Sequence, residues 1–294
     1  METSYRIGVD GGASKTDLVL MNQSGKVVAQ HAAPGCNPNV VGSEQARSTI
    51  LSALGEIHRS PVTHTQLYMA GIPEFWQELA RSLTDFGQVT TEKDSLPVLE
   101  LATRGEAGLV IHGGTGSFVA ARDPLGDVHY AGGLGWRLGE PGSGFDLGRR
   151  TVTRGMMELQ GWAPATRVGQ IVKDHGESIG IHDTAELLRY FYQNPAPNKV
   201  IASLAPAMLH LASEGDEMAT SMVLDSAQPL LDIATRVATQ LFPETPLDDV
   251  PAGLTGPIMT HPAVVQLLLP RTPLPLRPIK DSPILGVQRL LQRA

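Results

Sequence analysis

The sequence predicts an α/β protein with two domains of similar design, and three observations support this prediction. Between residues 66 and 102, short apolar segments typical of strands alternate with helical patterns, an order that indicates parallel strand pairing. A glycine-rich turn between two apolar segments occurs at residues 10–16 and again at 112–117. The chain of 294 residues is long enough for two ordinary domains. We therefore expect a second domain to begin near Glu106.

Composition and charge exclude several classes of protein. The chain is 41% hydrophobic and 18% charged, which is the balance of a soluble globular protein. Its net charge of −7 comes from dispersed acidic residues, so we expect neither nucleic acid nor membrane as a partner. We expect a cytoplasmic protein, because the first residues lack a signal-peptide pattern and no apolar run reaches transmembrane length. The single cysteine, Cys36, excludes an internal disulfide.

The opening stretch predicts a phosphate-binding turn between two strands. Residues 5–9 suit a buried strand, which ends at Asp10 and two glycines that allow a tight turn and a close approach to a ligand. Lys15 and Thr16 then add a cation and a hydroxyl, and this set suits a phosphate with its metal ion. Strands follow at 17–21 and 26–29, whereas P-loop and Rossmann turns lead into a helix. A plain hairpin turn is the structural alternative.

Two polar residues then occupy candidate ligand positions. Asn37 lies in a loop of turn-forming residues, where an Asx-turn is the alternative role. Ser43 is expected to cap the helix that follows it. Asp94 comes at the carboxyl end of a strand at 88–91 and at the start of a helix, an edge where open α/β sheets bind ligands. Aspartate is also an excellent helix N-cap, and position alone does not separate a cap from a general base.

Residues 108–144 predict a second phosphate loop and a glycine-rich segment. A strand at 108–111 leads through His112-Gly-Gly-Thr-Gly-Ser117 into a strand at 118–121. Thr115 and the backbone N–H groups suit a phosphate, whereas His112 suits a packed position at a strand end. The segment from Gly132 to Gly144 holds Glu140 and a tryptophan among more glycines than a structural loop requires. Two such loops in two similar halves predict a nucleotide held between the domains.

The remainder of the chain predicts mainly helices. They are expected at 145–159, 185–192, 199–211 and 216–242, and Pro229 is expected to kink or divide the last of these. A short strand and a turn of small residues follow within 249–257, and further helices are expected at 258–268 and 282–291.

Seven motifs, taken in order, resemble the N-acetylglucosamine kinase branch of the BadF/BadG/BcrA/BcrD ATPase family. They are Asp10–Thr16, Asn37–Gly42, Asp94, Gly114–Ser117, Gly133–Gly144, Ala252–Gly256 and Pro283–Gly286. The resemblance extends over essentially the whole chain. It implies two actin-like (ribonuclease H-like) halves, each a mixed five-stranded sheet flanked by helices, with ATP and substrate in the interdomain cleft. It implies domains of residues 1–105 plus 282–294 and of residues 106–281, the second with a helical insertion.

The resemblance also implies an activity and a role for each motif. The activity is transfer of phosphate from ATP, with Mg²⁺, to the primary hydroxyl of N-acetylglucosamine, giving the 6-phosphate, in a homodimer. Asp94 would accept the hydroxyl proton, and Asp10 would hold Mg²⁺. The sugar would be bound by Asn37, Asp94, Gly135 and Glu140. The nucleotide would be bound by Gly11, Gly12, Ser14, Lys15, Thr16, Gly114, Thr115, Gly116, Ser117, Gly253, Leu254 and Gly256.

One departure and several rival functions accompany this resemblance. The family usually has Gly-Asp-Glu-Gly-Ser where this chain has Gly139-Glu-Pro-Gly-Ser143, so the acid is one methylene longer. A kinase for glucosamine or another hexose would use the same motifs. A non-catalytic sugar or nucleotide sensor is a further alternative, although it would not need Asp94 as a base. An iron–sulfur activase is nearly excluded, because its cluster needs cysteine ligands from each subunit and this chain offers only Cys36.

Overall fold

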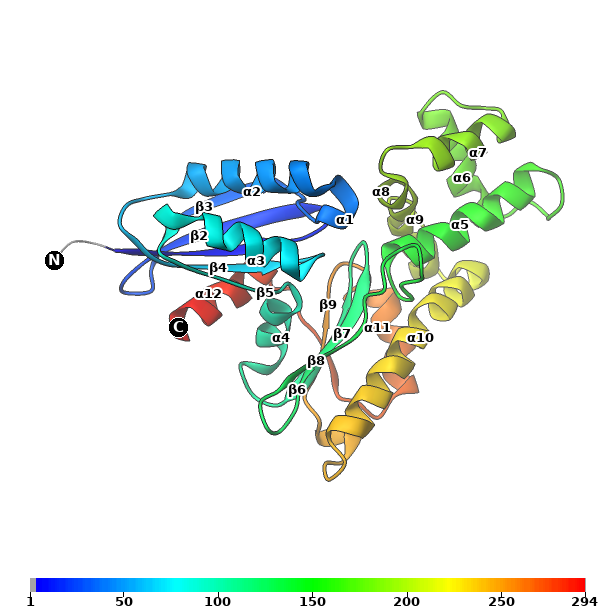
Figure 1. The fold of residues 1–294 in the computed structure, drawn as a ribbon. Coiled ribbons are helices and arrows are strands. Elements are labelled where there is room, and N and C mark those ends of the chain that lie inside the picture. Colours follow the sequence, from blue (N-terminus) through cyan, green and yellow to red (C-terminus); the bar gives the residue numbers. More distant parts are fainter. Residues whose placement is uncertain (1–3, 294) are drawn as a thin grey trace. The chain divides into compact units, whose positions relative to one another are not determined.

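The computed structural model describes residues 4–293, which form two compact units. Unit 1 comprises the chain up to Gly105 and again from Asp281, and unit 2 comprises Glu106–Lys280. Each unit has its own sheet (Figure 1). Among residues 4–293, no helix combines the length and the apolar character needed to cross a membrane.

Unit 1 is built on a mixed five-stranded sheet in the order β3-β2-β1-β4-β5. The first three strands form an antiparallel meander, and β4 and β5 run parallel to β1. The elements of unit 1 are β1 (Tyr5–Gly11), β2 (Lys15–Asn22), β3 (Val27–Pro34), α1 (Pro38–Val41), α2 (Ser43–Ile57), β4 (Val62–Met69), α3 (Pro73–Ser82), the 3₁₀ turn η1 (Thr84–Phe86), β5 (Gln88–Lys93), α4 (Ser95–Thr103) and α12 (Pro283–Arg293).

Helices cover both faces of the unit 1 sheet (Figure 1). One core lies beneath α2 and α3, and it includes Ile7, Leu67 and Trp76. On the opposite face α12 packs against β1 and α4, although it comes from the far end of the chain. This docking requires close contact, since a Cβ on Gly8 would clash with the side chains of Val287 and Leu291.

Unit 2 repeats the strand plan of unit 1 in the order β10-β9-β6-β7-β8. Strands β6, β7 and β8 form the antiparallel meander, β9 runs parallel to β6, and β10 runs parallel to β9. The elements of unit 2 are β6 (Gly108–Gly113), β7 (Ser117–Arg122), β8 (Val128–Gly132), α5 (Gly144–Leu159), α6 (Arg167–Ser178), α7 (Thr184–Gln193), α8 (Pro197–Ala202), α9 (Ala205–Ser213), α10 (Glu217–Leu241), η2 (Leu247–Asp249), β9 (Ala252–Thr255), α11 (Pro262–Leu268), η3 (Leu269–Arg271) and β10 (Leu276–Pro278). The expectation of two α/β sheets of one design is confirmed.

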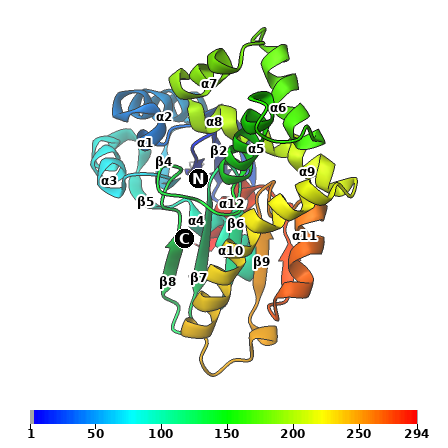
Figure 2. The ribbon, with the colours of Figure 1, turned by 90° about the vertical axis from the view of Figure 1, so that its right-hand side faces the viewer.

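The core of unit 2 lies between its sheet and α10, which runs along β6, β7 and β8 (Figure 2). Fully buried side chains from both elements, such as Ile111, Val119 and Leu231, form this core. Helices α5–α9 come between β8 and α10 in the chain and supply the helical part of the unit.

Four local predictions differ from the structure. Helix α10 continues through Pro229, which therefore does not divide it. The segment expected as one helix at 199–211 is two, because Pro206 in the first turn of α9 has no N–H to continue α8. Ser43 does not cap α2; it is the first helical residue, and Gly42 occupies the cap position. Strands β8 and β10 were not predicted, and both are short edge strands.

Candidate active site

The first glycine-rich turn joins β1 to β2 with its backbone close to the sheet. The N–H of Gly12 donates to the Lys15 carbonyl at 2.9 Å, which closes the turn. A Cβ on Gly11 would meet the Met69 side chain on β4, so the turn packs closely on that strand. Ser14 and Lys15 are exposed at the tip, and the Lys15 ammonium forms an ion pair with Asp17. The turn thus presents a cation at the end of the sheet.

Thr16 differs from its neighbours because its hydroxyl is buried. The Oγ1 atom donates to the Pro34 carbonyl at 2.8 Å and lies 3.1 Å from the Cys36 sulfur. These contacts join the turn to the end of β3. Its role in nucleotide binding stays a prediction, and the structure gives its hydroxyl a packing role.

Two carboxylates lie at the carboxyl edge of the unit 1 sheet. Burial, followed by the negative charges of Asp94 and Asp17, raises the pKa of Asp10 to about 7, and Lys15 partly offsets this shift. Burial raises the pKa of Asp94 to about 6, while the N–H groups of Asp94 and Ser95 and the charge of Lys93 act in the opposite direction. Shifts of this kind, with a neighbouring charge, are typical of functional sites.

The structure separates the two roles that position alone left open for Asp94. This residue stands at the N-cap position of α4 but has φ −60° and ψ −13°, and its side chain makes no capping hydrogen bond. N-cap residues usually have extended backbone angles, from which the side chain reaches the N–H groups of the first turn. Asp94 is therefore not a standard helix cap, and its partly buried carboxylate is available for chemistry.

Asn37 forms the Asx-type turn that its sequence context allowed, and this turn uses only the oxygen of its side-chain amide. Its Oδ1 atom accepts from the Asn39 N–H at 3.0 Å and so caps the short helix α1. Gly71, two residues beyond the end of β4, lies against this amide, because a Cβ there would be 2.5 Å from the Asn37 Oδ1. Within residues 4–293, no acceptor is found for the Asn37 Nδ2 group, which is left to donate to a ligand.

In unit 2, the two glycine-rich loops are hydrogen-bonded together. The N–H of Gly144 donates to the Gly114 carbonyl at 2.7 Å, and that of Phe145 donates to the Thr115 carbonyl at 3.2 Å. The Ser117 hydroxyl donates to the Pro141 carbonyl at 2.7 Å. The predicted phosphate loop and the 132–144 segment therefore form one structural element.

Glu140 is half-buried where these loops meet. A Cβ on Gly116 would lie 2.8 and 3.0 Å from the two carboxylate oxygens of Glu140, so the acid packs on the phosphate loop. Burial raises the pKa of Glu140 to about 6, and hydrogen bonds from the backbone N–H groups of Gly135 and Ser117 partly offset the shift. Gly135 has φ +85° and open space beside it.

His112 is a packed residue, as expected. Burial lowers its pKa to about 4, so the ring is neutral. Its Nδ1 atom lies 3.1 Å from the Thr255 hydroxyl, and its ring stacks on Phe118 with 4.8 Å between centroids.

The predicted adenosine segment continues from β9 into a turn. Gly253 and Leu254 lie within the strand, and the Leu254 side chain is fully buried in the unit 2 core. Gly256 has φ +81°, and a Cβ there would clash with the Gly113 backbone. Any contact of this segment with a nucleotide is thus expected from its backbone.

The residues present fit Mg²⁺ in the form in which it accompanies ATP. Among residues 4–293, no group of three or more His, Cys, Asp or Glu side chains is arranged to hold a metal. Mg²⁺ in kinase sites needs only one or two carboxylates, because water and substrate phosphates supply its other ligands. Asp10, with the charge of Asp94 nearby, provides such a donor set.

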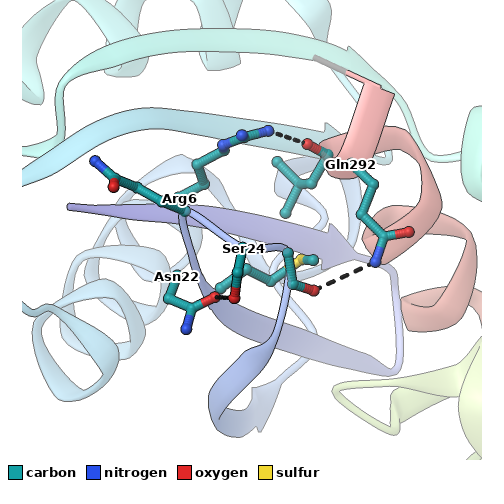
Figure 3. Close-up of a pocket in the computed structure, with 8 residues that line it drawn as sticks. Arg6, Asn22, Ser24 and Gln292 are labelled. Carbon is teal, nitrogen blue, oxygen red and sulfur yellow. Dashed lines mark hydrogen bonds between the residues drawn. The ribbon is translucent and has the colours of Figure 1, made fainter. Parts of the chain in front are cut away.

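A separate pocket of about 230 Å³ lies elsewhere in unit 1 (Figure 3). It lies where β1 begins, between the β2–β3 turn and the end of α12. Arg6, Asn22, Ser24 and Gln292 line it, and the Arg6 guanidinium donates to the Leu291 carbonyl at 2.6 Å. None of the predicted site residues lines this pocket, so it does not add to the candidate active site.

Two neighbours of the candidate site were not identified from the sequence. Gly71 contacts Asn37, and Gly142, with φ +74°, lies beside Glu140 in the chain and packs on Leu230 and Met259. The position of Gly71 shortly after a strand could have indicated it, since ligand edges in α/β sheets use such glycines. No pattern in the sequence indicates that Gly142 contacts Leu230 and Met259, which are distant from it in the chain.

Comparisons with known proteins agree with this architecture. Residues 7–268 match the model of the BadF/BadG/BcrA/BcrD ATPase family. The chain is 25% identical to an N-acetyl-D-glucosamine kinase of Dictyostelium discoideum, over 82% of this chain and 81% of that protein. It is 24% identical to an N-acetylmuramic acid/N-acetylglucosamine kinase of Clostridium acetobutylicum, over 77% and 76%.

Solved structures share the fold. A Chromobacterium violaceum protein provisionally named N-acetylglucosamine kinase is 24% identical with a TM-score of 0.79, covering 98% of this chain and 99% of that one. A ROK family glucokinase from Streptomyces griseus is 13% identical with a TM-score of 0.59, covering 99% of both chains. The predicted actin-like fold is thereby confirmed. Because the family match extends over most of its length, this chain belongs to the BadF/BadG/BcrA/BcrD ATPase family.

Proposed function

We propose that this protein is an ATP-dependent amino-sugar kinase that phosphorylates the primary hydroxyl of N-acetylglucosamine and releases N-acetylglucosamine 6-phosphate. Membership in an ATPase family and relatives named as amino-sugar kinases bear out the expectation of an ATP-dependent sugar kinase. The acetylated sugar and the position of transfer are the proposal. The observation that supports it best is the Asp94 carboxylate, which stands at a helix start without capping the helix.

Asp94 has the properties of a general base for a sugar hydroxyl. Its pKa of about 6 leaves it ionised at neutral pH, yet more basic than an ordinary aspartate. In the proposed reaction, it accepts the proton of the attacking hydroxyl as the new oxygen–phosphorus bond forms and the bond from the γ-phosphorus to the bridging oxygen of ATP breaks, so that ADP leaves. Asn37 would donate from its Nδ2 group to a sugar hydroxyl, which would orient the acceptor.

The remaining residues hold the phosphates and neutralise their charge. Phosphoryl transfer depends mainly on alignment and on electrostatic stabilisation, which backbone N–H groups and a cation provide. The turn after β1 would supply N–H groups and the Lys15 ammonium, and the loop before β7 would supply further N–H groups. Asp10 would hold Mg²⁺, which neutralises charge on the phosphates when bound. Glu140 would accept hydrogen bonds from sugar hydroxyls.

The choice of N-acetylglucosamine over a free amine rests on the named relatives, because the charge of the site does not separate the two sugars. Both relatives described above are named for N-acetylglucosamine, while a further relative, 24% identical, is a glucosamine kinase of Vibrio cholerae. The carboxylates of Asp94 and Glu140 accept hydrogen bonds equally well from hydroxyls and from an ammonium. A glucosamine kinase is therefore the closest alternative.

The decisive experiment measures sugar-dependent ADP release from Mg-ATP. The sugars are N-acetylglucosamine, glucosamine, N-acetylmannosamine, glucose and 6-deoxy-N-acetylglucosamine. We expect N-acetylglucosamine to stimulate turnover and its 6-deoxy analogue to have no effect. The variant Asp94→Asn should lose at least about 100-fold in kcat while still binding Mg-ADP, whereas the exposed control Asp85→Asn should match wild type. Stimulation by glucosamine alone would favour the glucosamine kinase. Full activity of Asp94→Asn would overturn the assignment of Asp94 as the general base.

A further inference from the structure

The Glu140 carboxylate lies directly on the predicted phosphate loop of unit 2. Its two oxygens are 2.8 and 3.0 Å from the position that a Cβ on Gly116 would take. The Ser117 N–H, one of the donors expected to face a phosphate, donates to this carboxylate. Gly135 donates a second N–H from the other loop. The carboxylate is thus bound as an anion by the loop that is expected to bind a nucleotide.

A carboxylate and a phosphate compete for such donors. Backbone N–H groups in a glycine-rich turn bind either anion, and charge-assisted hydrogen bonds are the stronger ones. Two anions on the same donors also repel one another. Within residues 4–293, Glu140 has no cationic side chain as a partner, so nothing there neutralises its charge. A phosphate at Gly116 would therefore require the carboxylate to move.

The side chain can move, whereas the backbone of the loops is held. Hydrogen bonds of 2.7 Å and 3.2 Å from Gly144 and Phe145 tie the two loops together, and the Ser117 hydroxyl adds a third tie to Pro141 at 2.7 Å. The Glu140 carboxylate is at the end of a flexible side chain, and at the neighbouring Gly135 a Cβ would meet nothing within 4 Å. A new partner for the carboxylate would thus clear the loop without unfolding it.

We propose that the Glu140 carboxylate competes with the nucleotide for the N–H groups of the phosphate loop. When the sugar binds, its hydroxyls hydrogen-bond the Glu140 carboxylate, which leaves the loop and allows ATP to bind there. This inference rests on the proposed function, in which Glu140 binds sugar hydroxyls. It assigns to Glu140 the coupling of the two substrates. Without sugar, nucleotide binding is weakened, so ATP is not hydrolysed wastefully by water.

The test is the affinity for Mg-ADP, measured by titration calorimetry with and without saturating N-acetylglucosamine. In the wild type, we expect the sugar to tighten Mg-ADP binding roughly tenfold, the order expected for one or two charge-assisted hydrogen bonds. Without sugar, Glu140→Gln should bind Mg-ADP roughly tenfold more tightly than wild type, and added sugar should tighten it little further. The control Glu244→Gln removes an exposed carboxylate of the same unit and should behave as wild type.

The variant Glu140→Asp distinguishes two explanations of weak sugar-free Mg-ADP binding: direct contact of the carboxylate with the loop at Gly116, and repulsion between the negative charges. It keeps the negative charge but is one methylene too short for the contact at Gly116, so it should also bind Mg-ADP more tightly than wild type without sugar. If Glu140→Asp equals wild type while Glu140→Gln is tighter, charge alone is responsible and the proposal is wrong. Equal sugar-free affinity of Glu140→Gln and wild type would overturn it as well.

Failure of this inference is distinguishable from failure of the kinase assignment. Sugar-stimulated turnover of the wild type tests the assignment, whereas sugar-free Mg-ADP affinity of the variants tests the contact. If no sugar stimulates turnover but Glu140→Gln and Glu140→Asp bind Mg-ADP more tightly, the competitor role stands and the kinase assignment falls. If turnover is normal and the variants bind as wild type does, the kinase assignment stands alone.

Discussion

The negative charge of Asp94 raises the pKa of Asp10, although the two residues come from different strands of unit 1. Asp10 is the second-last residue of β1 and Asp94 follows β5, so the sheet gathers both acids at its carboxyl edge. Neighbouring carboxylates in a desolvated site favour proton uptake or cation binding. This relationship leads to predictions about pH.

We expect log kcat to fall as the pH is lowered through about 6, because the base must be ionised. Asp94 has a raised pKa of about 6, so the active carboxylate is present above this value and is lost below it. Direct detection of sugar phosphate between pH 5 and 8 would measure this fall in kcat. The variant Asp85→Asn should show the same fall in kcat near pH 6. A fall near pH 4 instead would show that Asp94 titrates as an ordinary acid.

Asp94→Asn should stabilise the protein at pH 8. For an acid, a folded-state pKa above the unfolded value of 3.8 means that ionisation destabilises the folded state. This penalty is complete above about pH 6 and absent below about pH 4, and it amounts to at most about 3 kcal/mol. Urea denaturation should therefore show a gain at pH 8 that disappears at pH 4. An equal effect at both pH values would mean that ionisation of Asp94 is not the cause.

Gly286→Ala should destabilise unit 1, because α12 docks closely at this position. A Cβ on Gly286 would clash with the Pro97 backbone of α4, and backbone moves less readily than a side chain. We expect a loss of about 1–3 kcal/mol in the free energy of unfolding. The matched control is Gly55→Ala in α2, where a Cβ meets nothing within 4 Å. This control should gain about 0.5–1 kcal/mol, and a similar loss in both variants would contradict the docking argument.

Thr16→Val and Lys15→Met should separate packing from phosphate binding in the first turn. The Thr16 hydroxyl is buried against Pro34, so its loss should cost about 1–3 kcal/mol of stability with little change in Mg-ADP affinity. Lys15 is exposed, so Lys15→Met should leave thermal stability nearly unchanged and weaken Mg-ADP binding roughly tenfold. Calorimetry and thermal melts measure both effects. The reverse pattern would place the Thr16 hydroxyl on the phosphate.

Much of the fold could be predicted because glycine clusters and apolar periodicity are local patterns. The turn at 10–16, the loop at 112–117 and the strands on either side of each lie where the sequence predicted them. The edge strands β8 and β10 could not be predicted, because a short edge strand depends on its pairing partner. Pro229 was expected to kink or divide its helix, and α10 continues through it.

By itself, the sequence determined the fold class, the family and the set of polar residues at strand ends, since these depend on residue types and their order. Only the tertiary structure decided what those side chains do. Whether Asp94 caps a helix depends on its backbone angles, and whether Thr16 or Glu140 is available to a ligand depends on its neighbours in space. The pKa values of Asp10 and Asp94 likewise arise from burial and nearby charge, which exist only after strands far apart in the chain have paired.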